Sequence, residues 1–460
     1  MAARRLCLLA AAAFAVPAGC GGGDAPPKRL RASTSAAAAA ARAAAAPALA
    51  ERLAFHLDAL ARAAREHDGN RAAGTPGGAA SEDHVERALR AAGFAVRRQR
   101  VSFDQFVERH PPTLRRPGRA FRAPREIRTL EFSPAGTVTG RVRAVPGLGC
   151  RAADHRALRR GEVALVTRGT CKLLTKAQLA AQAGAAAVLI VNTPAAQSGG
   201  RRTYTGTLGG PDVDVPVLGV GEAVGADVRG RTVTLRVDAT SGRLSAENVI
   251  ADAPGGDPRR VVMVGAHLDS VGEGPGLNDN GSGVAAVLAL AERLAAKPAP
   301  AGAARLRVAF WAAEELGSIG SREYVRRLSR AQRRAIRAYV NLDMVGSRNG
   351  APFVYDSGNA IERRLRAGVA AAGLRPESTD IGGASDHDSF RRAGIAVGGV
   401  YSGSTERMSR VIAKRQHGRT GRPYDGCYHR ACDRRAAVDE TLARDLAAVT
   451  ESAVRALRRR

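Results

Sequence analysis

The sequence predicts an α/β protein whose main domain is interrupted by a second, smaller and β-rich domain. In the main domain, short apolar runs that are typical of buried strands alternate with amphipathic segments that are typical of helices. The apolar runs cover residues 261–265, 306–313 and 338–344. Residues 128–245 differ, because short strands and turns alternate there. We therefore predict that this second stretch is an insert and that the flanking parts fold together.

The first residues have the pattern of an export signal. Two arginines precede an apolar stretch over residues 6–16, and Pro-Ala-Gly-Cys follows, ending at Cys20. We predict a secretory signal peptide over residues 1–20 and an exported protein. The Ala-Gly-Cys ending resembles a bacterial lipobox, which implies lipidation of Cys20 and attachment to the outer face of the cell membrane. Residues 21–46 are rich in Ala, Gly and Pro and are predicted to form a low-complexity tether.

Residues 47–127 form the first part of the predicted main domain, and residues 246–460 form the second. Leucines at helical spacing predict a helix over residues 47–65. Ser81 begins a second helix, which Gly93 ends. The alternating apolar and polar residues that follow predict an edge strand.

The charge of the chain is strongly positive. The 460 residues carry a formal net charge of +28, and most of the basic residues are scattered arginines. The sequence has no zinc finger, helix-turn-helix or basic strip interleaved with aromatic residues. We therefore attribute the charge to a solvated surface and predict no nucleic-acid partner.

Histidine and acidic side chains follow the predicted strands of the main domain. His267 and Asp269 end the first strand, and the two-residue period of a strand places them on one face. In open α/β sheets, ligands bind at the carboxyl ends of the strands. The further candidates at such ends, or in a loop near the C-terminus, are Asp279, Glu314, Glu315, Asp343 and His429.

Two histidines and three carboxylates suit a pair of divalent metal ions. Imidazole nitrogen and carboxylate oxygen form a normal set of zinc ligands. Two zinc ions about 3.5–4 Å apart need one ligand that contacts both. We expect Asp279, on a tight turn, to be that bridge. Glu314 and Glu315 point apart on an extended chain, so one can be a ligand and the other a general base.

Several blocks of the sequence resemble one family of enzymes. The blocks AHLDSV, NDNGSG, AAEELGSIGS, LDMVG, SDH and CYHRACD are similar, in this order, to the co-catalytic zinc aminopeptidases of clan MH, the bacterial leucyl aminopeptidase and aminopeptidase Y group. The resemblance implies a three-layer α/β/α architecture with a central mixed sheet, the zinc exopeptidase fold, and two Zn²⁺ ions. The insert resembles a protease-associated (PA) domain.

The resemblance also implies roles for single residues. Glu314 is the implied general base, and the phenol of Tyr428 stabilises the oxyanion. Asp269 orients His267, as a carboxylate behind a ligating histidine does. The peptide bond between Asp279 and Asn280 is implied to be cis. The implied metal ligands are His267, Asp279, Glu315, Asp343 and His429.

Four of the six cysteines fall into local pairs, which suits an oxidising compartment. The pairs are Cys150 with Cys171, in the insert, and Cys427 with Cys432, around the last candidate ligand. For the second pair, metal binding through thiolates is the alternative. Export and the resemblance imply disulfides instead.

The resemblance places four residues along the pocket for the first substrate side chain, namely Met344, Gly383, Tyr401 and Cys427. They are apolar or small, which favours Leu, Met or Phe. Some relatives have an arginine where this chain has Ala384.

We therefore predict an exported metallo-aminopeptidase that hydrolyses the first peptide bond of peptides with a free amino terminus. A zinc-bridged hydroxide is expected to attack the carbonyl, with Glu314 as general base. Two alternatives remain. One is another exopeptidase or a glutaminyl cyclase of the same fold, and the other is an inactive binding protein on this scaffold.

Overall fold

The computed structural model describes residues 32–193, 202–297, 299–380 and 382–459. The predicted signal peptide, with Cys20, lies outside these ranges. Helix α1 (Ala32–Glu66) begins within the predicted tether rather than at residue 47, since alanine has the highest helix propensity. The chain divides into two units, Met1–Pro47 and Ala48–Arg460, and the second unit is described below. Among the described residues, no helix has the length and apolar character that a membrane span requires.

The main domain is built on a mixed sheet, as predicted. Its strands follow the order β13-β12-β14-β11-β9-β10-β8, and β1 pairs with β8. Strands β14, β11, β9 and β10 are parallel, whereas β8 runs antiparallel to β10. The bounds are β1 (Ala95–Arg116), β8 (Thr232–Asp252), β9 (Asp257–His267), β10 (Ala304–Trp311), β11 (Ile336–Leu342), β12 (Phe353–Tyr355), β13 (Glu377–Thr379) and β14 (Val397–Tyr401).

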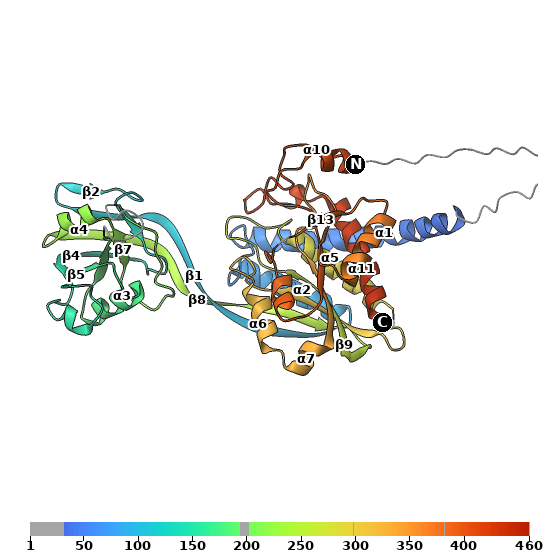
Figure 1. Cartoon of the computed structure of the whole chain (residues 1–460), viewed down its shortest axis with the longest axis horizontal. Coiled ribbons are helices and arrows are strands. Elements are labelled where there is room, and N and C mark those ends of the chain that lie inside the picture. Colours follow the sequence, from blue (N-terminus) through green and yellow to red (C-terminus); the bar gives the residue numbers. More distant parts are fainter. Residues whose placement is uncertain (1–31, 194–201, 298, 381, 460) are drawn as a thin grey trace, which may run out of the picture. The chain divides into compact units, whose positions relative to one another are not determined.

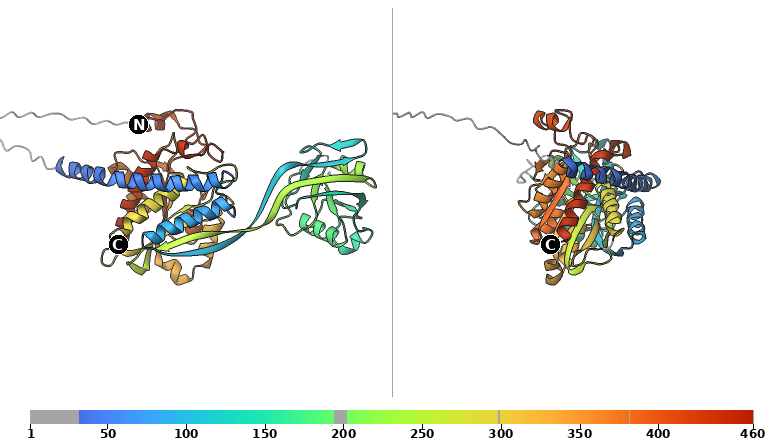
Figure 2. Two further views of the ribbon diagram at one scale, coloured as in Figure 1. Left: turned by 180° about the vertical axis from the view of Figure 1, so that it is seen from behind. Right: turned by 90° about the vertical axis from the view of Figure 1, so that its right-hand side faces the viewer.

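Helices cover both faces of this sheet. Along β9, Val262 and Val264 pack into one apolar cluster, and Val261 and Met263 pack into another, as the two-residue period of a strand requires. The first cluster is covered by α2 (Pro76–Ala91), α5 (Gly281–Ala295), α8 (Ala360–Ala371), α11 (Glu440–Arg458) and the second half of α1. The second cluster is covered by α6 (Ile319–Arg327), α7 (Arg330–Ala335) and α9 (His387–Arg392). Helices α5 and α11 lie side by side (Figure 2). The sheet is therefore the middle of three layers.

The insert contains its own sheet with two separate apolar clusters. Its strand order is β4-β5-β6-β7-β3, and β4 pairs with β8. Figure 1 shows β1 and β8 as a two-stranded ribbon that belongs to both sheets. The predicted boundaries at residues 128 and 245 fall within β3 and β8. The elements of the insert are β2 (Arg119–Phe121), β3 (Ile127–Thr129), β4 (Gly136–Ala144), η1 (Ala152–His155), β5 (Val163–Thr167), α3 (Leu173–Gln182), β6 (Ala187–Val191), β7 (Val217–Val220) and α4 (Glu222–Val228).

The parallel strands of the main domain end where the candidate site residues begin. Strand β9 ends at His267, and β10 ends shortly before Glu314. Strand β11 ends at Leu342, directly before Asp343. Because the three strands are parallel neighbours, their carboxyl ends bring these side chains to one edge. Two further elements, α10 (Arg410–Gln416) and η2 (Arg435–Ala437), flank the loop that carries His429.

Candidate metal centre

Two sets of three side chains meet at this edge, and they share Asp279. In the first set, His267 Nε2 lies 3.2 Å from Asp279 Oδ1 and 3.3 Å from Asp343 Oδ1. In the second set, His429 Nε2 lies 3.1 Å from Asp279 Oδ2 and 3.0 Å from Glu315 Oε2. Each set offers one imidazole and two carboxylates within 4.8 Å of one another. The two oxygens of Asp279 face different histidines, which is the arrangement of a bridging carboxylate.

The donor chemistry fits two zinc ions. Nitrogen and carboxylate oxygen are normal zinc ligands. Glu315 Oε1 is buried and accepts no hydrogen bond within the described residues. A buried carboxylate oxygen without a partner is costly, and a bound cation would satisfy it.

Backbone and side-chain hydrogen bonds hold the turn that carries Asp279. The backbone N–H groups of Asn278 and Asp279 donate to the Asp433 carboxylate at 2.7 and 2.9 Å. The Asp279–Asn280 peptide bond is cis, as the resemblance implies. Asn280 Oδ1 caps α5 by accepting from Gly283 N at 3.0 Å, and Asn280 Nδ2 donates to Leu342 O at 2.9 Å. The bridge candidate is thus fixed to α5 and to the end of β11.

Asp269 acts on the two glutamates more directly than on the histidine. Its carboxylate accepts hydrogen bonds from Glu314 N at 3.0 Å and from Glu315 N at 3.3 Å. It lies 3.8 Å from His267 Nδ1, beyond hydrogen-bond distance. His267 Nδ1 contacts the backbone carbonyl of Asp269 instead, at 3.1 Å. The Asp269 backbone therefore orients the ring, and its side chain fixes the positions of Glu314 and Glu315.

Burial and the neighbouring charges of the cluster shift the pKa values of its members. Burial raises the pKa of Glu314 well above its usual value and raises that of Glu315 to about 7. Burial also raises the pKa of Asp279, but hydrogen bonds from His267 and His429 outweigh this and hold it at about 2. Hydrogen bonds to Asp279 and Glu315 raise the pKa of His429 to about 10. The metal-free cluster therefore retains protons, as expected of a site built for cations.

A cavity of about 320 Å³ opens onto the cluster. The Tyr428 ring stacks on His429, with 3.8 Å between the ring centroids, and lines this cavity. Of the predicted pocket residues, Met344 and Tyr401 line the cavity, whereas Gly383 and Cys427 are not among its lining residues. The sequence analysis missed five of the residues that do line it: Thr379, Asp380, Gly382, Ser404 and Glu406.

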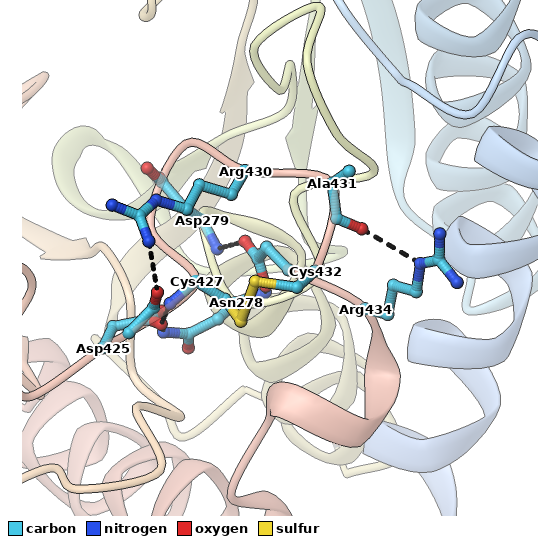
Figure 3. The surroundings of a disulfide bond; sticks show 10 residues. Asn278, Asp279, Asp425, Cys427, Arg430, Ala431, Cys432 and Arg434 are labelled. Carbon is cyan, nitrogen blue, oxygen red and sulfur yellow. Dashed lines mark hydrogen bonds between the residues drawn. A yellow bond between two sulfur atoms is a disulfide. The ribbon is translucent and has the colours of Figure 1, made fainter.

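Two disulfides are present, with the pairings that the resemblance implies. Cys150 is bonded to Cys171, and Cys427 to Cys432. The alternative of metal binding by the second pair as thiolates is therefore wrong. Figure 3 shows the Cys427–Cys432 disulfide beside Asn278. The loop is tied to that residue through Asp425, whose carboxylate accepts from Asn278 Nδ2 and from Cys427 N, both at 2.7 Å.

Sequence analysis also missed two residues that support the centre, Asp433 and Arg71. Asp433 ends the CYHRACD block, so its position next to the last ligand was a usable signal. Arg71 is fully buried and donates to three backbone carbonyls of the loop that follows His267. Nothing local to its turn-rich stretch indicated burial.

The chain is similar to several known proteins in sequence and in fold. The model of peptidase family M28 matches residues 248–454, and that of the PA domain matches residues 138–228. The probable lipoprotein aminopeptidase LpqL of Mycobacterium tuberculosis is 40% identical over 414 residues, which cover 84% of this chain and 80% of that protein. An aminopeptidase of Pseudomonas aeruginosa is 36% identical over 417 residues, which cover 84% of this chain and 76% of that protein. The structure of BSAP, a zinc aminopeptidase from Bacillus subtilis, aligns with a TM-score of 0.56 and 26% identity, over 88% of this chain and 94% of that one.

Proposed function

The chain belongs to peptidase family M28 and carries an inserted PA domain, and on that premise we propose that it removes the first residue from peptides with a free amino terminus. The proposal is supported chiefly by one observation. Two metal-donor sets share Asp279, and members of both line one cavity together with Glu314. The enzyme is thus a zinc-dependent aminopeptidase, and its proposed complement is two zinc ions.

The proposed ligands divide between the two ions. His267 and Asp343 would hold one ion, His429 and Glu315 the other, and Asp279 both. Zinc in such a set supplies Lewis acidity, which polarises a carbonyl group and makes water more acidic. The remaining steps belong to side chains of the protein.

Glu314 is the proposed general base. Its side chain lines the cavity but belongs to neither donor set. Ser318 Oγ donates to Glu314 Oε1 at 3.1 Å and so restrains the carboxylate. The pKa of Glu314, raised by burial, suits a group that accepts a proton and returns it. In the proposed reaction, Glu314 takes a proton from the attacking water and passes it to the leaving amine.

Tyr428 is proposed to stabilise the oxyanion that forms when the carbonyl is attacked. Tyr428 lines the same cavity, and burial raises the pKa of its phenol above the usual value. The group therefore remains a hydrogen-bond donor at neutral pH, as such stabilisation requires.

The substrate is proposed to bind by its amine and its first side chain. Glu314 and Asp343, which both line the cavity, are the acids proposed to bind the α-ammonium group. Met344 and Tyr401 provide an apolar wall for Leu, Met or Phe, and burial of such a side chain contributes roughly 1.5–3 kcal/mol. Ala384 in the cavity lining means that no arginine contributes at that position.

We also propose export. The M. tuberculosis relative is named a lipoprotein, and the two disulfides suit an oxidising compartment. Attachment through lipid on Cys20 belongs to the same proposal.

A panel of aminoacyl-p-nitroanilides tests the function. We expect hydrolysis of the leucine compound, loss of hydrolysis after chelation, recovery with zinc, and no hydrolysis of N-acetylated compounds. Equal cleavage of free and acetylated substrates would contradict an aminopeptidase.

A further inference from the structure

Arg71 is a fully buried arginine in the connection between α1 and α2. Its Nε donates to Pro275 O at 2.8 Å, its Nη2 to Gly276 O at 2.7 Å, and its Nη1 to Leu268 O. Its backbone N–H donates to Ser270 Oγ at 2.9 Å, and Ser270 N donates to Arg71 O at 3.3 Å. Arg71 therefore holds both ends of the loop over residues 268–276.

This loop separates two of the proposed metal ligands. It starts directly after His267 and leads into the turn of Asp279. The chain also passes close to itself, because a Cβ built at Gly276, where φ is +59°, would lie 2.3 Å from Asp279 O. The hydrogen bonds from Arg71 thus fix the path of the chain between His267 and the bridging carboxylate of Asp279.

The charge of Arg71 acts on a group of carboxylates. Burial lowers the pKa of Arg71 to about 10, and four surrounding acids oppose that shift, so the guanidinium stays charged at neutral pH. These acids are Asp269, Asp433, Asp279 and Glu315. Each of the three side-chain hydrogen bonds of Arg71 runs to a backbone carbonyl. The positive charge of Arg71 is therefore not paired with one carboxylate, and it attracts all four.

In the metal-free site, retained protons offset part of the charge of these buried carboxylates, and the uncompensated remainder is costly. We propose that Arg71 is a positioning residue that supplies part of the missing positive charge when the site holds no zinc, so that the site is assembled before the metal binds. This inference rests on the metal-ligand set of the proposed function. It assigns Arg71 no contact with the substrate.

The test compares thermal unfolding of the metal-free protein with that of the protein saturated with zinc. The variants are Arg71→Met, which removes the charge, and Arg71→Lys, which keeps it. Arg458→Met is the matched control, because Arg458 is also buried and its Nε donates to a backbone carbonyl, Ala304 O, at 2.9 Å. A titration with a competing chelator gives the zinc affinity of each variant.

We expect Arg71→Met to lower the Tm of the metal-free form more than that of the zinc form. Zinc should then raise the Tm by several degrees more than it does in the wild type. Arg71→Lys should restore most of the difference, and Arg458→Met should lower both forms equally. An equal loss in both forms of Arg71→Met, no recovery in Arg71→Lys, or failure of Arg71→Met to fold even with zinc would overturn the inference. Absence of any zinc effect in the wild type would instead contradict the proposed function.

Discussion

At the scale of single residues, the neighbours Glu314 and Glu315 are proposed to have different roles, as general base and metal ligand. Both acids are held by backbone hydrogen bonds to Asp269, yet only Glu315 contacts His429. We expect Glu314→Gln to lower kcat by about 10²–10⁴-fold, the usual range for a general base, with zinc content unchanged. Glu315→Gln should lose zinc, because it removes a charged ligand. Metal analysis together with leucine p-nitroanilide kinetics measures both, and exchanged phenotypes would reverse the assignment.

Two further carboxylates that line the cavity should influence which first residue of a substrate the enzyme prefers. Asp380 and Glu406 line it, and Glu406 is fixed by hydrogen bonds from Ser404 N at 2.9 Å and Ser404 Oγ at 3.0 Å. Acidic first residues should therefore be poor substrates. Since exposed charge pairs contribute about 0.2–1 kcal/mol, Glu406→Gln should raise kcat/KM for a glutamyl substrate, relative to a leucyl one, by up to about fivefold. Glu51→Gln, on the exposed face of α1, is the control, and an unchanged ratio in Glu406→Gln would exclude this role.

The residues of the site differ in how far the sequence reveals them. His267 and Asp343 stand at the ends of recognisable strands and Asp279 on the turn that leads into a helix, so a pattern of residue types is enough to propose them. Arg71 and Glu406 lack such a signal. Their positions depend on contacts between segments far apart in the sequence, and a charged residue in a turn-rich stretch is ordinarily exposed.

At the scale of elements, helices α1 and α2 meet at a contact between two histidine side chains. His56 Nδ1 lies 3.0 Å from His84 Nε2, and His56 Nε2 lies 3.3 Å from Glu292 on α5. Burial lowers the pKa of His84 to about 4, with His56, Arg87 and Arg62 acting in the same direction and Glu292 opposing them. His84 therefore stays neutral in the folded protein under conditions in which the unfolded chain binds a proton.

Stability should consequently fall as the pH is lowered from 6.5 to about 4. Above that window His84 is neutral in both the folded and the unfolded state, so it does not lower stability. Within the window the unfolded state binds a proton at His84 that the folded state excludes. His84→Gln should show a smaller loss of Tm between pH 7 and pH 4.5 than the wild type. The measurement uses metal-free protein, so that release of zinc in acid does not contribute. Parallel pH profiles for the two proteins would count against the assignment.

The Cys427–Cys432 loop is the second element with a testable role, because it carries Tyr428, His429 and Asp433. Replacing both cysteines by serine should lower zinc affinity or activity by about 10–100-fold, the range for residues that support metal ligands. The double variant of Cys150 and Cys171 removes a disulfide from the insert and should leave both unchanged. Chelator competition and kinetics distinguish the two loops. Equal behaviour of the two variants would show that the disulfide does not act through the site.

The sequence predicts most of the elements of the main domain and fewer of their pairings. Apolar runs locate β9, β10 and β11, and leucine spacing locates the buried part of α1. The predicted edge strand is longer in the structure, where β1 extends to Arg116 and pairs with β8 from Ala95↔Asp252 to Arg115↔Thr234. No local pattern indicates a partner so distant in the sequence, and the register depends on the whole fold.

At the scale of the molecule, the main domain and the insert have separate apolar clusters. Every residue of the four main-domain clusters lies outside residues 108–239. We expect the insert to be removable by joining Val107 to its cross-strand partner Thr240 through an Asn-Gly turn, which favours a tight hairpin. The shortened protein should fold, bind zinc and cleave leucine p-nitroanilide. Loss of cleavage with intact zinc binding would show that the insert takes part in handling even small substrates.

The ribbon of β1 and β8 has a consequence for the order in which the parts of the chain can fold. A protein is synthesised from its amino terminus, so β1 emerges long before β8, which it pairs with from Ala95↔Asp252 onward. Strands β3 to β7 are complete while β1 still lacks the part of its partner that belongs to the main sheet. The insert can therefore fold before the main domain. Its folding brings β1 and β8 together at the end that lies within the insert, and strand pairing can then extend toward the metal ligands. Because every proposed metal ligand lies after β8, the site can close only after the insert has been synthesised.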